Sequence, residues 1–183
     1  KFDGTAICLI YRDGKLAQAI TRGDGIKGDD VSRNVVSIES IPHILKGNNI
    51  PKEFEIRGEI IMPYEAFERL NTERTALDEA PFANPRNAAS GSLKLLDPSQ
   101  VKERGLDCIL YHLLGDDLPF STHREAIETA ASWGFHVSEK SIEAKNIEEV
   151  ISYIEKWDEG RKSLPYATDG IVIKVNQLDL QRQ

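Results

Sequence analysis

The chain has 183 residues, of which 40% are hydrophobic and 29% charged, and its formal net charge is −7. This length and composition fit one globular domain and exclude collagen, a coiled coil and general disorder. The acidic balance argues against a domain that grips DNA through bulk positive charge, so any contact with nucleic acid must be local.

Three further features set the context. No apolar run approaches the roughly 20 residues of a membrane span, and no signal peptide is visible, so we expect no membrane association. Cys8 and Cys108 lie in apolar, strand-like runs and are predicted to be reduced core thiols. The first residue is lysine and no leader precedes the first strand, so we expect an excerpt of a longer protein.

The elements can be read from alternation and caps. Asp13-Gly14 between two apolar runs favours a type I′ hairpin turn. Asn146 with Glu149 suggests a capping box, and Gly134 suggests a helix C-terminus. In chain order we predict strands over 5–12 and 15–22, a short helix over 29–36, a strand over 54–62, a helix over 64–77, a loop over 78–86, a helix over 87–96, a strand over 106–114, helices over 122–133 and 146–159, and a final strand over 170–175. Strands and helices without regular βαβ alternation indicate an α+β fold with mainly antiparallel sheets and flanking helices.

A glycine-rich segment, Gly23–Gly28, fits the G-x-G-x-x-G pattern of dinucleotide-binding folds. The strand before it arrives through a tight hairpin, however, and no second βαβ unit follows. We therefore set aside a nicotinamide-dependent oxidoreductase. The glycines and Asp24 are predicted to shape a loop on the rim of the sheet, and Arg22 just before them is a candidate site residue.

Two strand-like segments place charge on one face. Alternation within Asp169–Lys174 directs Lys174 and Val172 to one side and Ile173 into a core. A lysine beside a glycine and a small apolar residue suits a base or phosphate, although a half-exposed strand with one lysine is the alternative. In E-I-R-G-E, the last carboxylate, Glu59, could bind ribose hydroxyls or a hydrated metal, or belong to a surface ion-pair ladder.

Two other segments carry candidate phosphate chemistry. Residues 80–96 contain Arg86 and Lys94 among small and polar residues, with no acid. Arginine binds phosphate oxygens in a bidentate manner, so this is a candidate phosphate patch, with a tolerant surface loop as the alternative. The tetrapeptide K-x-D-G, Lys1 to Gly4, could alone be an exposed turn.

The order of motifs is informative. K-x-D-G, T-R-G-D-G-x-x-G-D-D-V, R-G-E, N-P-R-N-A-A-S-G-S-L-K and D-G-I-V-I-K together resemble the adenylation domain of bacterial NAD-dependent DNA ligases, from Lys1 through Lys174. The resemblance implies the covalent nucleotidyltransferase (ATP-grasp-like) fold of ligases and mRNA capping enzymes. It also implies that residues 1–183 form an adenylation core, without the N-terminal domain that binds the nicotinamide half or the C-terminal oligonucleotide-binding, zinc and helix-hairpin-helix domains.

The resemblance implies roles residue by residue. Lys1 would attack the adenylyl phosphorus of NAD and release nicotinamide mononucleotide, and AMP would then pass to the 5′-phosphate of nicked double-stranded DNA. A lysine amine, with an ordinary pKa of ~10.4, must lose its proton first; we expect Lys174, Arg86 and Mg²⁺ to favour that. The other implied roles are positioning by Asp3 and Gly4, catalytic support by Asp169, nucleotide contacts by Arg22, Glu59, Tyr111, Arg161, Val172 and Lys174, metal or ribose contact by Glu59, stacking on adenine by Tyr111, and phosphate or nick contacts by Arg86 and Lys94.

Lys94 stands where the family more often has arginine, and a lysine lacks the planar fork that binds phosphate in a bidentate manner. The alternatives are an ATP- or GTP-dependent nucleotidyltransferase of the same superfamily and a non-catalytic nucleic-acid-binding module, the latter weakened by the acidic charge. The resemblance further implies a bacterial cytoplasmic monomer that acts near the nucleoid in DNA replication and repair.

Overall fold

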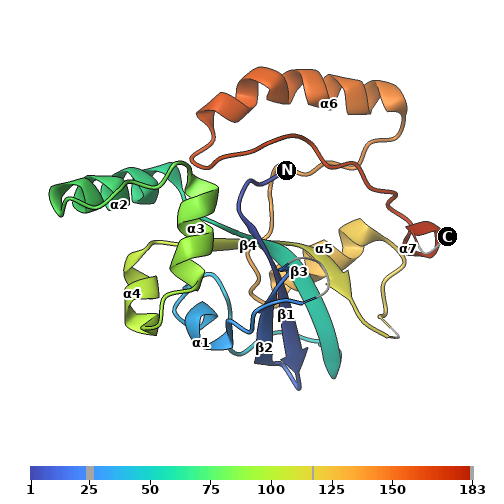
Figure 1. Cartoon of the computed structure of the whole chain (residues 1–183). Coiled ribbons are helices and arrows are strands. Elements are labelled where there is room, and N and C mark those ends of the chain that lie inside the picture. Colours follow the sequence, from blue (N-terminus) through green and yellow to red (C-terminus); the bar gives the residue numbers. More distant parts are fainter. Residues whose placement is uncertain (24–26, 117, 182–183) are drawn as a thin grey trace.

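A computed structural model of the chain describes residues 1–23, 27–116 and 118–181 (Figure 1). The elements in chain order are β1 (Thr5–Arg12), β2 (Lys15–Thr21), α1 (Ser32–Val35), β3 (Glu53–Ile61), α2 (Tyr64–Ala76), α3 (Pro85–Leu93), α4 (Pro98–Glu103), β4 (Asp107–Leu114), α5 (His123–Ser132), α6 (Ile147–Gly160), the 3-10 turn η1 (Arg161–Ser163) and α7 (Leu178–Gln181). This confirms the α+β class.

A four-stranded antiparallel sheet in the order β2-β1-β3-β4 forms the centre of the fold. One face is apolar and packs against α1, α5 and the loops around them, with Leu9, Ile56 and Leu110 fully buried. A smaller cluster joins α2 to α3 through Leu70, Ala88 and neighbouring side chains. We call the opposite face of the sheet, which carries Glu59, Tyr111 and His112, the site face.

Local sequence signals account for several elements. Asp13 and Gly14 both have positive φ, 50° and 72°, as a type I′ turn requires, so the predicted hairpin is confirmed. The side chain of Asn146 accepts the Glu149 N–H at 2.9 Å and caps α6, as predicted. Thr122 caps α5 in the same way, at 3.2 Å from the Glu125 nitrogen.

The prediction for the two cysteine thiols is confirmed for their reduced state but only for one of them in its location. Both cysteines are free, as expected. Cys108 is buried in the core, but Cys8 lies on the site face, where its Sγ is 3.5 Å from Oε2 of Glu55. The prediction of two core thiols was therefore wrong for Cys8, because alternation along β1 sends its neighbours Ile7 and Leu9 into the core instead.

The strand predicted over 170–175 does not form, and this prediction was wrong. The segment is extended, but none of these residues pairs with a neighbouring strand among the described residues. A run with strand-like alternation becomes a strand only when a second strand supplies hydrogen bonds. As a result Ile173, predicted to enter the core, is 64% exposed, and Val172 is 55% exposed.

The stretch around Arg86 also differs from its prediction. The loop predicted over 78–86 ends earlier, because Pro85 begins α3 and Asn84 caps it by accepting the Asn87 N–H at 2.8 Å. Arg86 therefore lies in the first turn of a helix. The helix α4 was not predicted at all, although Asp97 followed by Pro98 is a recognisable helix start.

Two other observations concern the chain as a whole. The central residues of the predicted glycine-rich rim loop, 24–26, which include Asp24, lie outside the described residues. None of the helices in the described ranges is long and apolar enough to cross a membrane.

Candidate active site

The segment at Lys1 lies beside residues 167–169, far away in the sequence. The Asp3 N–H donates to the carbonyl of Ala167, and the Asp169 N–H donates to the carbonyl of Lys1, both at 3.0 Å. These backbone bonds bring K-x-D-G next to D-G-I-V-I-K. The Nζ of Lys1 lies 2.9 Å from Oδ2 of Asp169, and both side chains are partly exposed, at 56% and 36%.

Gly4 and Glu59 are joined where β1 meets β3. A Cβ on Gly4 would lie 2.1 Å from the carbonyl oxygen of Ile60, so only glycine allows this close approach. The Glu59 carboxylate accepts a hydrogen bond from the Gly4 N–H and, at 3.4 Å, from the Tyr111 hydroxyl. Burial raises the pKa of Glu59 despite these donors, which favour its charged form.

The helix α3 brings Arg86, a predicted phosphate-binding residue, next to Asp3 in the Lys1 segment. Ala88, Ala89 and Leu93 fix α3 against the protein interior. Arg86, on its first turn, places Nη1 3.7 Å from Oδ1 of Asp3. Lys94 follows the last turn and lies 3.5 Å from the carboxylate of Asp29, so it is held at the rim of the site rather than at Lys1.

Lys174 reaches the site face from the extended segment. Its Nζ lies 5.3 Å from the centre of the Tyr111 ring and 3.1 Å from Nδ1 of His112. Burial lowers the pKa of Lys174 and raises that of Tyr111 to about 12, with Glu59 adding to the latter shift. Lys174 and Tyr111, both predicted to contact the nucleotide, thus lie together, and His112, which no motif had marked, lies beside them.

The charges around Lys1 differ from the expectation. The hydrogen bond to Asp169 is the main cause that raises the pKa of Lys1, and Glu59 and Asp3 add to it. The same contact lowers the pKa of Asp169. The protein's own groups thus favour the ammonium form of Lys1, whereas Lys174 and Arg86 were expected to favour the neutral amine.

The remaining predicted residues are more widely spaced. Arg22 follows β2, and its positive charge opposes the rise in the Tyr111 pKa, which places it near that ring. Arg161 lies in η1 at the end of α6, and no described hydrogen bond or ion pair joins its side chain to the Lys1 group. Val172 is exposed beside Lys174.

The carboxylates of the site bear on how a metal ion could bind. Within the described ranges no cluster of three or more His, Cys, Asp or Glu side chains could hold a metal ion by itself. Mg²⁺ commonly keeps several waters and takes one or two protein carboxylates together with substrate phosphates. The half-buried carboxylate of Glu59 would be one protein ligand in that mode of binding.

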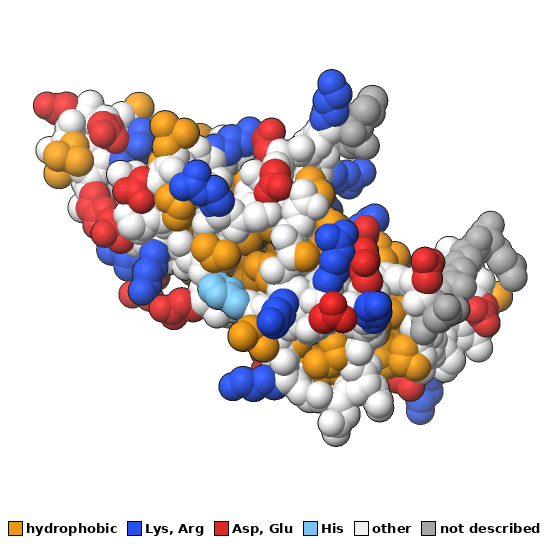
Figure 2. Space-filling view, turned by 90° about the horizontal axis from the view of Figure 1, so that it is seen from below, with side chains coloured by type: hydrophobic (Ala, Val, Ile, Leu, Met, Phe, Trp, Pro, Cys, Tyr) orange, Lys and Arg blue, Asp and Glu red, His pale blue; other side chains and the backbone are white. Residues whose placement is uncertain are grey.

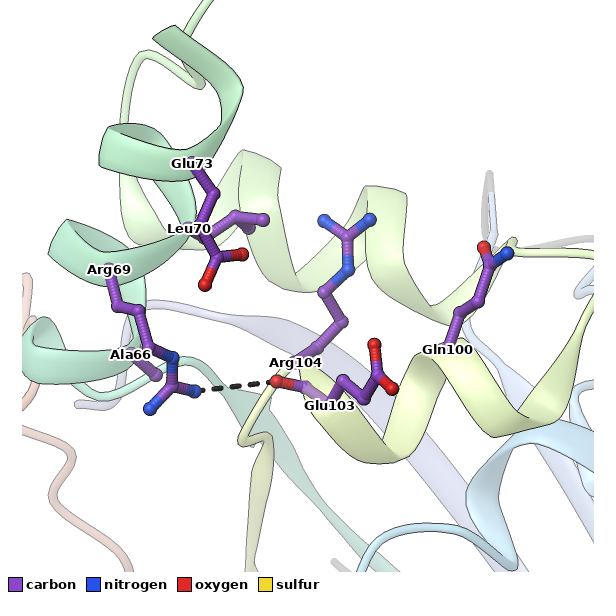
Figure 3. Close-up of a pocket in the computed structure, with 7 residues that line it drawn as sticks. All are labelled: Ala66, Arg69, Leu70, Glu73, Gln100, Glu103 and Arg104. Carbon is purple, nitrogen blue, oxygen red and sulfur yellow. Dashed lines mark hydrogen bonds between the residues drawn. The ribbon is translucent and has the colours of Figure 1, made fainter. Parts of the chain in front are cut away.

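Other surfaces are distinct from this site. A cavity of about 200 Å³ lies between α2 and α4, where Arg69 donates to the carbonyl of Glu103 (Figure 3). Its arginines, Arg69 and Arg104, are balanced by Glu73 and Glu103. On the face shown in Figure 2, acidic and basic side chains alternate with apolar ones and form no large patch of one charge.

The fold and the site define an α+β domain in which a lysine amine, three carboxylates and further cations meet on one sheet face and its edge. The whole chain, residues 1–183, matches the model of the NAD-dependent DNA ligase adenylation domain, and the chain belongs to this family.

Curated relatives agree. The chain is similar to DNA ligases of Bacteroides fragilis (56% identical over 182 residues), Phocaeicola vulgatus (55% over 182) and Cytophaga hutchinsonii (52% over 183). In each case the match covers 100% of this chain and 27% of the relative. The chain thus spans about a quarter of the length of the relatives it matches.

Proposed function

We propose that the chain is the adenylation core of an NAD-dependent DNA ligase, with the covalent nucleotidyltransferase fold over residues 1–183. Family membership supports the adenylation chemistry. The observation that carries the assignment of the site is the contact between Lys1 and Asp169 at 2.9 Å, because it joins the two motifs that the chemistry requires.

In the proposed step, the Nζ of Lys1 attacks the adenylyl phosphorus of NAD. The new bond joins nitrogen to phosphorus, and the broken bond is the phosphoanhydride that releases nicotinamide mononucleotide. Before the attack the ammonium must lose a proton, which passes to solvent water. The hydrogen bond to Asp169, whose pKa is lowered by the same contact, orients Nζ of Lys1 and does not make Asp169 the base. Entry of a phosphate also adds negative charge, which Arg86 and Lys174 offset electrostatically.

The other site residues hold the nucleotide. Tyr111 offers its ring to the adenine, and Glu59 the carboxylate that binds ribose hydroxyls or Mg²⁺. Arg22, Arg161 and Val172 line the rest of the nucleotide pocket, and Gly4 keeps the Lys1 segment against β3. When bound, Mg²⁺ would neutralise charge on the phosphates.

The second half of the proposal concerns DNA. The AMP passes from Lys1 to the 5′-phosphate at a nick in double-stranded DNA, with Arg86 and Lys94 on the phosphates. In a chain of net charge −7, these local cations make the contact. We further infer a monomeric enzyme of the bacterial cytoplasm that serves DNA replication and repair.

The test is the intact mass of the full-length protein after incubation with Mg²⁺ and either NAD or ATP. We expect one AMP adduct with NAD and none with ATP. Lys1→Arg should abolish the adduct, because arginine keeps the charge but cannot present a neutral amine. The matched control, Lys15→Arg in the exposed hairpin, should react like the wild type.

The outcomes separate the alternatives. An adduct with ATP would favour an ATP-dependent nucleotidyltransferase. An adduct that survives in Lys1→Arg would overturn the nucleophile. No adduct with either donor, in a folded protein that binds nicked DNA, would favour a non-catalytic binding module.

A further inference from the structure

A bulge in β4 turns two consecutive side chains to the same face. Arg57 of β3 pairs with His112, but the next residue, Gly58, pairs with Leu110, so Tyr111 is an extra residue in β4. In a regular strand Tyr111 and His112 would point to opposite faces. Here Lys174 contacts both, so both lie on the site face. Bulges often re-aim side chains beside active sites.

The contact between His112 and Lys174 has one consistent set of protons. The Lys174 ammonium can only donate, so Nδ1 of His112 must accept and its ring proton must reside on Nε2. Burial, together with the positive charges of Lys174, His123 and Arg57, lowers the pKa of His112 to about 4. The imidazole is thus neutral near pH 7 and can accept.

The backbone after Lys174 is fixed independently of this contact. The side chain of Asn176 accepts the Arg124 N–H at 3.0 Å, and its carbonyl accepts the His123 N–H at 2.7 Å. These bonds hold the segment against the start of α5. What they do not fix is the direction of the long Lys174 side chain, which forms no ion pair with a carboxylate among the described residues.

We propose that His112 is a positioning residue that holds the ammonium of Lys174 over the ring of Tyr111, at the place where the adenylyl group of the nucleotide is bound. This inference rests on the proposed function. It assigns no catalytic contact to His112 itself. It predicts that the rate of adenylation depends on an acceptor atom at the position of Nδ1. It also predicts that this rate does not depend on the ability of the ring to take up a proton.

The first arm of the test measures adenylation under single-turnover conditions in the full-length protein. His112→Leu removes the acceptor and should slow formation of the AMP adduct roughly 10- to 100-fold, the range expected for one charge-assisted hydrogen bond. His112→Asn places an amide oxygen close to the position of Nδ1 and should keep the rate within about threefold of the wild type. His43→Leu, at a histidine that bonds the Val36 carbonyl outside this group, is the control and should react normally.

The second arm does not depend on activity. Two-bond ¹H–¹⁵N correlation of the histidine rings should show His112 as the Nε2–H tautomer. Lys174→Met should raise the pKa of His112, because it removes a nearby positive charge. A melting temperature of His112→Leu within a few degrees of the wild type excludes unfolding as the cause of a slow rate.

Each result decides a point. Equal rates for His112→Leu and the wild type, or a slow His112→Asn that matches His112→Leu, would overturn the positioning role. An Nδ1–H tautomer, or a pKa unmoved by Lys174→Met, would overturn the contact. If the wild type forms no adduct with NAD, the proposed function fails and the positioning role with it, whereas the ring spectra still decide whether the contact exists.

Discussion

The guanidinium of Arg86, in the first turn of α3, lies 3.7 Å from the carboxylate of Asp3, two residues after Lys1. This pair links the N-P-R-N block to K-x-D-G across 83 positions of the sequence. Both side chains are substantially exposed, at 62% and 30%. An exposed ion pair contributes little to the free energy of folding. We therefore expect this contact to orient the Arg86 side chain next to Lys1 and not to stabilise the fold.

Arg86→Ala should therefore separate stability from activity. We expect the melting temperature to stay within a few degrees and sealing of nicked DNA by the full-length protein to fall at least tenfold. Arg12→Ala, which breaks an exposed pair with Glu53 at the far end of β1, is the matched control and should leave sealing unchanged. A large drop in melting temperature with a proportionate loss of sealing would show that Arg86 is structural.

Gly4→Ala should harm both folding and chemistry. The new Cβ would overlap the Ile60 carbonyl, and relieving such overpacking costs about 1–3 kcal/mol of unfolding free energy. The shift would also disturb the hydrogen bond from Gly4 to Glu59, so formation of the AMP adduct should slow. Urea denaturation and adduct mass measure the two effects.

The control for Gly4 is Gly14→Ala. Nothing lies within 4 Å of a Cβ there, but φ is 72°, which costs a non-glycine residue about 1–2 kcal/mol. This variant should lose stability and still form the adduct at the normal rate. Normal adduct formation in a Gly4→Ala protein would contradict the role given to the close approach.

A pair of isoleucines tests the position of the 170–175 segment. Ile60→Ala, at a fully buried residue of β3, should lower the free energy of unfolding by about 2–5 kcal/mol. Ile173→Ala, at a side chain that is 64% exposed, should change it by less than about 0.5 kcal/mol in the 183-residue chain. If Ile173→Ala destabilises as much as Ile60→Ala, the segment is packed in a core after all.

These two isoleucines also show what sequence patterns can and cannot predict. Alternation and turn residues located β1, β2, β3 and β4 to within a residue or so, because each strand has a buried face in the same sheet. The identical pattern around Ile173 failed, since alternation says which side chains share a face but not whether a neighbouring strand exists. Whether a strand finds a partner depends on the tertiary fold and not on the pattern within the segment.

The site shows the same division. The motifs predict Lys1, Asp169 and Lys174 as site residues, and the structure brings Lys1 into contact with Asp169 and Lys174 to the ring of Tyr111. His112 was missed because period-two alternation directs it away from Tyr111, and a bulge leaves no clear mark in one sequence. The direction of the pKa shift of Lys1 could not be predicted from the sequence either, because it depends on how close Asp169 lies to Lys1 in the fold.

The stability of the folded chain should depend on pH through His112. Its pKa falls from 6.5 to about 4 on folding, so the unfolded state binds more protons between these values. The contribution is fully present above pH 6.5 and is lost as the pH falls towards 4. His112→Asn should therefore become more stable relative to the wild type on going from pH 7 to pH 5.

Urea denaturation at the two pH values measures this difference, and solvent exposure of the ring will reduce its size. A constant offset between His112→Asn and the wild type at the two pH values would mean that His112 is not desolvated in the folded protein.

The bulge at Tyr111 makes the length of β4 a requirement in its own right. Only Tyr111 and His112 lie between Leu110 and Leu113, so deleting either one would restore a regular ladder and leave a single side chain facing the site at this point. The bulge is therefore what allows the ring that lies against Lys174 and the imidazole that accepts from it to come from consecutive residues of one strand. Moving the lost side chain elsewhere in β4 would not restore this arrangement, because residues that share a face of a regular strand are two positions apart.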